Sequence, residues 1–334
     1  MPNFVINNWN DIASGFRGGG LILGNGASIS VSDNFDYPSI FEKAKEEGHI
    51  DEPLERIFDD LQTKDFEFVL RELWHSKGIN RALNLDPESK VSEAYNNVKD
   101  ALINTVCSIH ENVTYDSVKE KLKKASRFLS QFKIIFSLNY DLLVYWAIMI
   151  GNDNDPNRFK DCFKYGVFDL EKALSPEGST LVFYPHGNLV IGRHVEGGDV
   201  KIGADGRRRH DLLNTIIDKW RSENFVPVFV SEGNKEQKKR TIFQSPYLDL
   251  IYKYFLKDIG NSIVIYGWSM KRRDDHIVEA ICKKKPTKFA VSLYTNRPEY
   301  TETRERIKNK LRSKLGQQLQ IYFFKAQSEG CWIY

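Results

Sequence analysis

Short apolar segments without a polar interruption recur along this chain, and most of them are followed at once by glycine or polar residues. An unbroken apolar run is typical of a strand that is covered on both faces, as in a parallel sheet. Stretches with helical periodicity separate most of these runs, so the sequence predicts an α/β fold with an open, mostly parallel sheet. The expected strands are 21–24, 133–138, 180–184, 226–230, 262–266, 289–293 and 320–324, and the expected later helices are 210–222, 245–257, 273–283 and 298–315.

Residues 37–130 interrupt this alternation. The segment is acidic, and its apolar residues recur at i, i+3 and i+4 among charged positions, which indicates several amphipathic helices. We expect 37–130 to be a helical insertion. Residues 1–36 and 131–334 then form one α/β domain around it.

Composition narrows the class of protein. Of the 334 residues, 41% are hydrophobic, which supports a sizeable core and excludes global disorder. The formal net charge is only +3, so we expect no direct nucleic-acid binding. Residues 1–130 carry 15 basic and 21 acidic side chains, whereas residues 131–334 carry 33 and 24. The second part is therefore the better place for an anionic ligand.

Cysteine spacing and hydropathy indicate a soluble, cytoplasmic protein. The four cysteines (Cys107, Cys162, Cys282 and Cys331) lie far apart, so they form neither a metal-ligand motif nor a dense disulfide framework. No basic segment leads into an apolar stretch at the N-terminus, so we expect no secretory signal. The longest apolar run, 142–150, is about half of the ~20 residues that a membrane helix needs, so we expect no membrane contact.

The first candidate site follows the run at 21–24. A buried strand that leads into Gly24, Asn25, Gly26, Ala27 and Ser28 and then a helix can bring backbone N–H groups close to a phosphate. A tight strand-to-helix turn without a ligand is the alternative. The third glycine of the common dinucleotide fingerprint and the Gly-Lys-Ser/Thr of a P-loop are both absent.

Polar residues also follow two later strands. Asn139 and Asp141 come just past the run at 133–138, where ligands lie in open α/β sheets. Asn139 can bind ribose hydroxyls or a water, whereas Asp141 can equally cap the next helix. His186 ends the run at 180–184 between a proline and a glycine, and it is the best candidate for a general base near neutral pH. A buried structural histidine is the alternative.

The fourth candidate is the Gly267-Trp-Ser269 segment after the run at 262–266, which fits a nucleotide clamp. Asp274 and Asp275 follow, and they can simply favour the start of a helix. His276 is the only other histidine beside a motif. Four short basic clusters, 207–209, 238–240, 271–273 and 283–285, are expected to be solvated surface.

The four strand ends carry Gly-x-Gly-Ala-Ser, Asn-Tyr-Asp, His-Gly and Gly-Trp-Ser in chain order. This set resembles the sirtuin-like (SIR2-like) family, and within it a prokaryotic antiphage-defence branch with a domain of unknown function, DUF4917. The segments 65–70, 227–233 and 245–248 also resemble that branch. The resemblance implies a Rossmann-like SIR2-like sheet and NAD+ as the substrate rather than a true cofactor.

The resemblance also implies roles for individual residues. Asn139 and His186 match the family's catalytic asparagine and histidine. Asp141 would help to bind the nicotinamide end, while Gly267 and Ser269 would contact the adenosine half. The residues that would cradle the diphosphate are Gly24, Asn25, Gly26, Ala27 and Ser28.

The chain departs from the sirtuin deacylases because it has no Cys-x-x-Cys pair for their zinc ribbon. We therefore expect no zinc, and we expect an NAD+ glycohydrolase (NADase) that releases nicotinamide and ADP-ribose. The resemblance implies an antiphage effector that is activated by homo-oligomerisation or by a partner sensor, such as a HAM1-like nucleotide pyrophosphatase or a HerA-type ATPase. The alternatives are a non-catalytic NAD- or ADP-ribose-binding sensor module and a sirtuin-type protein deacylase.

Overall fold

The computed structural model describes residues 5–85, 89–194, 198–203, 211–221, 225–230 and 233–334. Its centre is a seven-stranded sheet in which every paired neighbour is parallel, in the order β12-β11-β10-β1-β2-β6-β3. This confirms the expected α/β fold with a Rossmann-like parallel sheet. The strands are β1 (Gly20–Leu23), β2 (Ile134–Ser137), β3 (Phe159–Lys160), β6 (Thr180–Phe183), β10 (Ser262–Tyr266), β11 (Lys288–Leu293) and β12 (Gln320–Lys325).

The central strands are buried along almost their whole length, which explains their unbroken apolar sequences. Every residue of β1, β2 and β6 is buried, because helices cover both faces of the sheet. The chain proceeds from β1 to β2 and β6 on one side, and then returns to β10 on the other side of β1. The strand order thus reverses beside β1. In open α/β sheets, such a reversal leaves a crevice at the carboxyl ends of the strands.

A second, antiparallel sheet follows β6, and the sequence pattern did not predict it. Its order is β4-β5-β8-β7-β9. The run at 226–230, expected in the parallel sheet, is β9 of this second sheet and pairs antiparallel with β7. That assignment was wrong because an apolar run shows that a strand is buried but not which sheet buries it. The strands are β4 (Phe163–Lys164), β5 (Val167–Phe168), β7 (Gly187–His194), β8 (Asp199–Lys201) and β9 (Phe225–Phe229).

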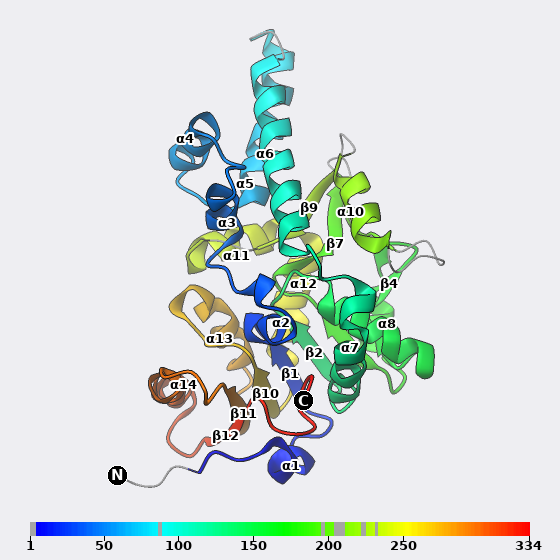
Figure 1. The fold of residues 1–334 in the computed structure, drawn as a ribbon, viewed down its shortest axis with the longest axis vertical. Coiled ribbons are helices and arrows are strands. Elements are labelled where there is room, and N and C mark those ends of the chain that lie inside the picture. Colours follow the sequence, from blue (N-terminus) through cyan, green and yellow to red (C-terminus); the bar gives the residue numbers. More distant parts are fainter. Residues whose placement is uncertain (1–4, 86–88, 195–197, 204–210, 222–224, 231–232) are drawn as a thin grey trace.

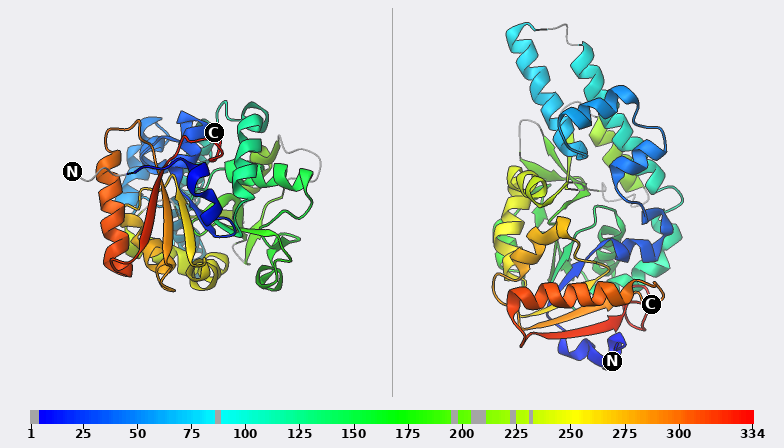
Figure 2. Two further views of the ribbon diagram at one scale, coloured as in Figure 1. Left: turned by 90° about the horizontal axis from the view of Figure 1, so that it is seen from below. Right: turned by 90° about the vertical axis from the view of Figure 1, so that its left-hand side faces the viewer.

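Helices fill the chain between β1 and β2, as expected for 37–130. Side-chain caps begin most of them, including Ser39, Asp51, Asp65 and Thr114, each of which accepts a hydrogen bond from a first-turn N–H. Helices α5 and α6 form an arm that projects from the body of the molecule (Figures 1 and 2). The helices from β1 to β2 are α2 (Asn25–Val31), α3 (Ile40–Glu46), α4 (Glu52–Asp60), α5 (Phe66–Leu83), α6 (Ser89–Ile109) and α7 (Tyr115–Leu129).

The later helices mostly match the expected ranges. The longest apolar run forms α8 (Leu143–Asn154), which is buried over most of its length and packs against α7. The expected helix at 245–257 is α12 (Pro246–Leu250), which continues through a π-helical turn and a 3₁₀ turn to Asp258. The others are α1 (Trp9–Ile12), α9 (Leu170–Leu174), α10 (Leu212–Arg221), α11 (Lys235–Gln244), α13 (Asp275–Ile281) and α14 (Tyr300–Leu315).

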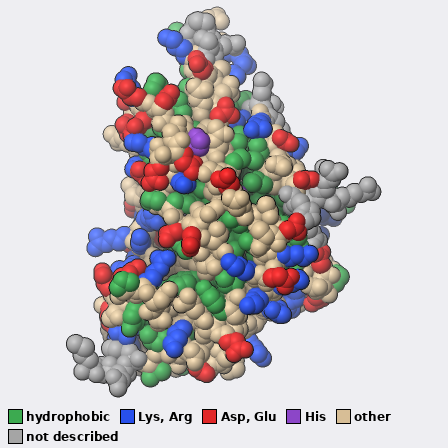
Figure 3. All heavy atoms as spheres, in the orientation of Figure 1, with side chains coloured by type: hydrophobic (Ala, Val, Ile, Leu, Met, Phe, Trp, Pro, Cys, Tyr) green, Lys and Arg blue, Asp and Glu red, His purple; other side chains and the backbone are tan. Residues whose placement is uncertain are grey.

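The surface carries charges of both signs. On the face drawn in Figure 3, basic and acidic side chains are interspersed and do not form one extended field. Within the part of the chain that the structure describes, no helix is both long and apolar enough to cross a membrane.

Candidate functional site

The carboxyl ends of four adjacent strands, β10, β1, β2 and β6, surround one cavity of about 950 Å³. It lies beside the reversal of strand order, where an open α/β sheet places its ligand. Eight of the ten residues expected at the site line this cavity: Gly24, Asn25, Gly26, Asn139, Asp141, His186, Gly267 and Ser269. Ala27 and Ser28 lie behind them, buried in the first turn of α2.

The glycines let two loops pack directly on one another. A Cβ on Gly24 would lie 2.5 Å from the Trp268 Cβ, and a Cβ on Gly26 would lie 2.9 Å from the Gly267 Cα. Gly267 has φ +67°, and a Cβ there would lie 2.4 Å from the Ala27 nitrogen. The Gly26 N–H donates to the Gly267 carbonyl at 2.8 Å. These glycines therefore satisfy loop packing first, and the Gly26 N–H is already engaged by protein.

Asn139 is fixed by its amide nitrogen. Nδ2 donates to the Gly24 carbonyl at 3.1 Å and to the Ser28 hydroxyl at 2.7 Å. Both amide hydrogens are thereby used. Oδ1 has no hydrogen-bond partner among the described residues and is not one of the enclosed polar atoms. The side chain thus presents a hydrogen-bond acceptor to the cavity.

Ser28 and Asp141 lie behind this amide. The Ser28 hydroxyl donates to Asp141 Oδ2, and the Leu143 N–H donates to Asp141 Oδ1 at 2.9 Å. Burial raises the pKa of Asp141, although both hydrogen bonds favour its ionised form. Asp141 is not the N-cap of α8, which is Leu142, but it lies one residue earlier, accepts from the first N–H of the helix, and also orients Ser28. Both of its oxygens are engaged by protein.

His186 lies where the chain leaves the parallel sheet for the antiparallel one. The turn requires Gly187, which has φ +77° and whose Cβ would lie 2.0 Å from the Val228 carbonyl oxygen. The His186 Nε2 lies 2.9 Å from the Nε2 of His276 on α13. Burial, and next the Lys238 ammonium, lower the pKa of His186 well below its usual range. His186 is consequently neutral at physiological pH.

An ion pair lies against this histidine pair. Lys238 Nζ lies 2.8 Å from Asp274 Oδ1, and Trp268 Nε1 donates to Asp274 Oδ2 at 3.3 Å. Although burial opposes the shift, Lys238 holds the pKa of Asp274 below its ordinary range. Lys238 is 3% exposed, so the expectation that the cluster 238–240 is solvated was wrong for this residue. Sequence alone gave no sign of its distant partner.

Two basic side chains at the mouth of the cavity are free to bind an anion. Lys271 and Arg273 line the cavity, are exposed, and make no ion pair among the described residues. Arg306 on α14 also lines it, but its guanidinium donates to the Ser269 carbonyl at 2.7 Å and so supports the loop. The cluster 207–209 lies outside the described residues.

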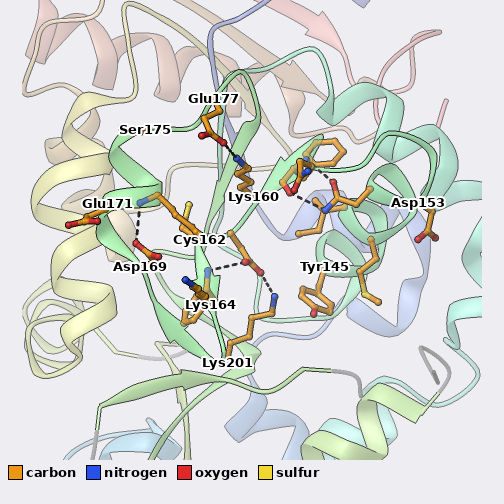
Figure 4. A pocket seen from close by; sticks show the side chains of 18 residues that line it. Tyr145, Asp153, Lys160, Cys162, Lys164, Asp169, Glu171, Ser175, Glu177 and Lys201 are labelled. Atoms are coloured by element: carbon orange, nitrogen blue, oxygen red, sulfur yellow. Dashed lines mark hydrogen bonds and ion pairs between the residues drawn. The ribbon is translucent and has the colours of Figure 1, made fainter. Parts of the chain in front are cut away.

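Figure 4 shows a second cavity, of about 930 Å³, between α8 and the strands β3, β4 and β8. Charged side chains of this cavity pair with one another: the partly buried Lys201 pairs with Asp161, and its ammonium lies 4.9 Å from the centre of the Tyr145 ring. Lys160 pairs with Glu177 at 2.9 Å. None of the site residues expected from the sequence lines this cavity.

Among the described residues, no three His, Cys, Asp or Glu side chains are placed to hold a metal ion. A search of curated proteins finds no match for this sequence. The family model described as "Domain of unknown function (DUF4917)" matches residues 21–332, from β1 almost to the last residue of the chain. Because one family model covers nearly the whole chain and every element that contributes to the cavity, this protein belongs to the DUF4917 family.

Proposed function

We propose that the protein is a SIR2-like NAD+ glycohydrolase that cleaves NAD+ to nicotinamide and ADP-ribose. The observation that carries the proposal is the convergence of Asn139 and His186 on one cavity with the glycine loops at 24–28 and 267–269. The cavity of about 950 Å³ is large enough for a dinucleotide. Its place beside the reversal of strand order is where such ligands bind in this class of sheet.

The bond to be broken needs little acid catalysis. Nicotinamide is attached to ribose as a pyridinium and leaves as a neutral molecule, so the two carboxylates of an ordinary glycosidase are not required. The protein must instead position the ribose, exclude bulk water and hold the attacking water. In our proposal, Asn139 Oδ1 accepts a hydrogen bond from a ribose hydroxyl or from that water. His186 contacts a ribose hydroxyl from the adjacent strand end.

The charged side chains of the cavity indicate where the diphosphate of NAD+ would lie. The exposed Lys271 and Arg273 are available for the diphosphate, which carries the negative charge of NAD+. Ser269, on the same loop, lies beside them and is the candidate contact to the adenosine half. Ser28 and Ala27 act from behind the cavity, so their part is to hold the loop rather than to touch the ligand.

The test is to incubate NAD+ with the purified chain and separate the products by chromatography. We expect nicotinamide and ADP-ribose from the wild type, and loss of both products in Asn139→Ala and His186→Ala variants whose circular dichroism is unchanged. Asn154→Ala, an exposed asparagine on α8, is the matched control and is expected to keep full activity. Full turnover in both site variants would reject the assignment.

Two other outcomes would redirect the proposal. Binding of ADP-ribose without nicotinamide release indicates a sensor module. NAD+ consumption only in the presence of an acylated peptide indicates a protein deacylase. Four isolated cysteines provide no zinc ribbon for the acyl-peptide cleft, which favours water as the acceptor.

The proposal includes control by assembly, because an unregulated NADase would deplete the NAD+ of its host. The family resemblance suggests an antiphage effector that is activated by homo-oligomerisation or by a sensor partner, with a HAM1-like pyrophosphatase and a HerA-type ATPase as the first partners to try. The measurement is the rate per chain as chain concentration rises, with and without each partner. A full rate in the isolated monomer would contradict this part of the proposal.

A further inference from the structure

One hydrogen lies between the rings of His186 and His276. Their Nε2 atoms are 2.9 Å apart and the ring centroids 5.1 Å apart. Burial, and next the Lys238 ammonium, lower the pKa of both rings, for His276 to about 4. Since both rings are neutral, each carries one N–H, and only one of them can direct its N–H along this contact. The question is which ring donates.

The other nitrogen of His276 decides between the two arrangements. His276 is fully buried, and its Nδ1 is an enclosed atom without a hydrogen-bond partner among the described residues. If His186 donated, His276 would carry its hydrogen on Nδ1, as an orphaned buried N–H. If His276 donates, its Nδ1 is only an unused acceptor. Orphaned buried donors are the rarer of the two in folded proteins.

A third histidine of this chain shows the same preference. His110 is buried, and burial lowers its pKa to about 4, so it too is neutral. Its Nδ1 lies 2.9 Å from the Val106 carbonyl oxygen, which can only accept, so the hydrogen is on Nδ1. The Nε2 of His110 is then an enclosed acceptor without a partner. In this case too, the unpartnered buried nitrogen is the one without a hydrogen.

We propose that His276 donates its Nε2 hydrogen to His186 and so keeps His186 in the tautomer that carries its hydrogen on Nδ1. His186 lines the cavity, and its Nδ1 has no partner among the described residues and is not one of the enclosed polar atoms. Nδ1 is therefore the nitrogen that can meet a ligand. His186 then offers a hydrogen-bond donor to the cavity, and His276 is the residue that positions this hydrogen.

This inference rests on the proposed function for its chemical meaning. A donor at His186 Nδ1 holds a ribose hydroxyl through the oxygen lone pair, beside the acceptor that Asn139 Oδ1 provides. No base is needed to complete the reaction. The C1′–nitrogen bond breaks with its electron pair going to nicotinamide, water adds to C1′, and the proton of that water passes to solvent. The products are nicotinamide, ADP-ribose and one proton.

The tautomer can be measured on the whole, unliganded chain, independently of any activity. Long-range ¹H–¹⁵N spectra of protein labelled at histidine distinguish a hydrogen on Nδ1 from one on Nε2. We expect Nδ1–H for His186 and Nε2–H for His276, with His110 as the internal reference for Nδ1–H. The His186→Asn and His276→Gln variants assign the signals by their loss. Nε2–H at His186 would overturn the inference.

Matched amide variants test the consequence. The amide nitrogen of asparagine lies as many bonds from Cα as the Nδ1 of histidine, and that of glutamine matches Nε2. His186→Asn therefore keeps a donor but no base, and we expect it to exceed His186→Ala in kcat by about tenfold or more. His276→Gln still donates to His186, whereas His276→Leu cannot. We expect His276→Leu to lower kcat by about tenfold or more relative to His276→Gln.

The two proposals fail in different ways. If the wild type releases no nicotinamide, the proposed function fails, but the spectra still decide the tautomer. If the wild type is active, and His186→Asn is as inactive as His186→Ala, then His186 acts as a base and only the present inference fails. Equal kcat in His276→Gln and His276→Leu likewise contradicts a positioning role for His276.

Discussion

At the scale of single residues, the site depends on the direction of a short hydrogen-bond chain. The Ser28 hydroxyl has one hydrogen, which it donates to Asp141 Oδ2, so it accepts from the Nδ2 of Asn139. Nδ2 is thereby turned inward, and Oδ1 faces the cavity. The buried Asp141 carboxyl group, whose two oxygens are engaged by protein, thus fixes the polarity of the Asn139 side chain, which contacts the ligand in our proposal.

Replacing Ser28 by alanine tests this chain. The change leaves a buried carboxylate oxygen and one hydrogen of the Asn139 amide without their shared partner, so we expect the free energy of unfolding to fall by about 1–3 kcal/mol. The amide also loses its fixed orientation, so activity should fall more than the loss of folded protein explains. Urea denaturation and product chromatography measure the two effects. Ser130 is the matched control, because it is only partly buried and its hydroxyl donates one hydrogen bond, to the Arg127 carbonyl. Ser130→Ala should change the free energy of unfolding by less than about 0.5 kcal/mol.

At the scale of secondary structure, apolar runs predicted the parallel sheet well. A strand that is covered on both faces is apolar along its length and does not alternate between apolar and polar residues. The second sheet was missed for a physical reason. Strands β4 and β5 have two residues each, which is too short to show a hydrophobic periodicity. Strand β7 begins immediately after His186, which was interpreted as a site residue and not as the residue before a strand. The run at 226–230 was recognised as a strand but placed in the wrong sheet.

The site shows the same division between local and distant information. The strand-end residues could be found because each follows an apolar run directly. Lys238 and His276 could not be assigned, because their importance comes from contacts with Asp274 and His186 across 36 and 90 residues of sequence. A basic triplet on a helix looks solvated until the fold places an aspartate beside it.

The turn from β6 into β7 should be intolerant of any side chain at Gly187. An alanine there must adopt φ +77° and place its Cβ 2.0 Å from a backbone oxygen of β9, which cannot move without disrupting the β7–β9 pairing. We expect Gly187→Ala to lower the free energy of unfolding by more than about 2 kcal/mol. Gly178→Ala also has a positive φ, of +82°, but nothing lies within 4 Å, so its cost should be about 1 kcal/mol. Equal losses in the two variants would contradict the steric argument.

At the scale of the whole molecule, a cluster of acidic and basic side chains joins helix α5 of the arm to helix α11 and to strands β7 and β8. Asp65 caps α5 and accepts from the Thr241 hydroxyl on α11 at 3.2 Å. Glu67, also on α5, lies 3.9 Å from Arg193 on β7, and Arg193 pairs with Asp199 on β8 at 2.8 Å. Segments that are far apart in sequence thus meet through buried acidic groups and two partly buried arginines.

This cluster predicts how stability changes with pH. Burial, and next the negative charge of Asp65, raise the pKa of Glu67 to about 8, while Arg193 and Arg71 oppose the shift. The pKa of Asp65 is raised to about 6, mainly by burial. Between the ordinary glutamate pKa of about 4.3 and pH 8, the folded chain holds a proton on Glu67 that the unfolded chain releases. The free energy of unfolding must therefore decrease as pH rises through this window.

Glu67→Gln removes this titration and should flatten the dependence. We expect its stability curve between pH 5 and 8 to fall less steeply than that of the wild type, by up to about 1.4 kcal/mol per pH unit, which is the effect of one proton. Urea denaturation at each pH provides the measurement, and Asp65, Arg71, Arg193 and Asp199 contribute to both curves. Glu46→Gln, at an exposed position on α3, should reproduce the wild-type slope. Parallel curves for Glu67→Gln and wild type would mean that Glu67 is already ionised in the folded protein, held by the two arginines.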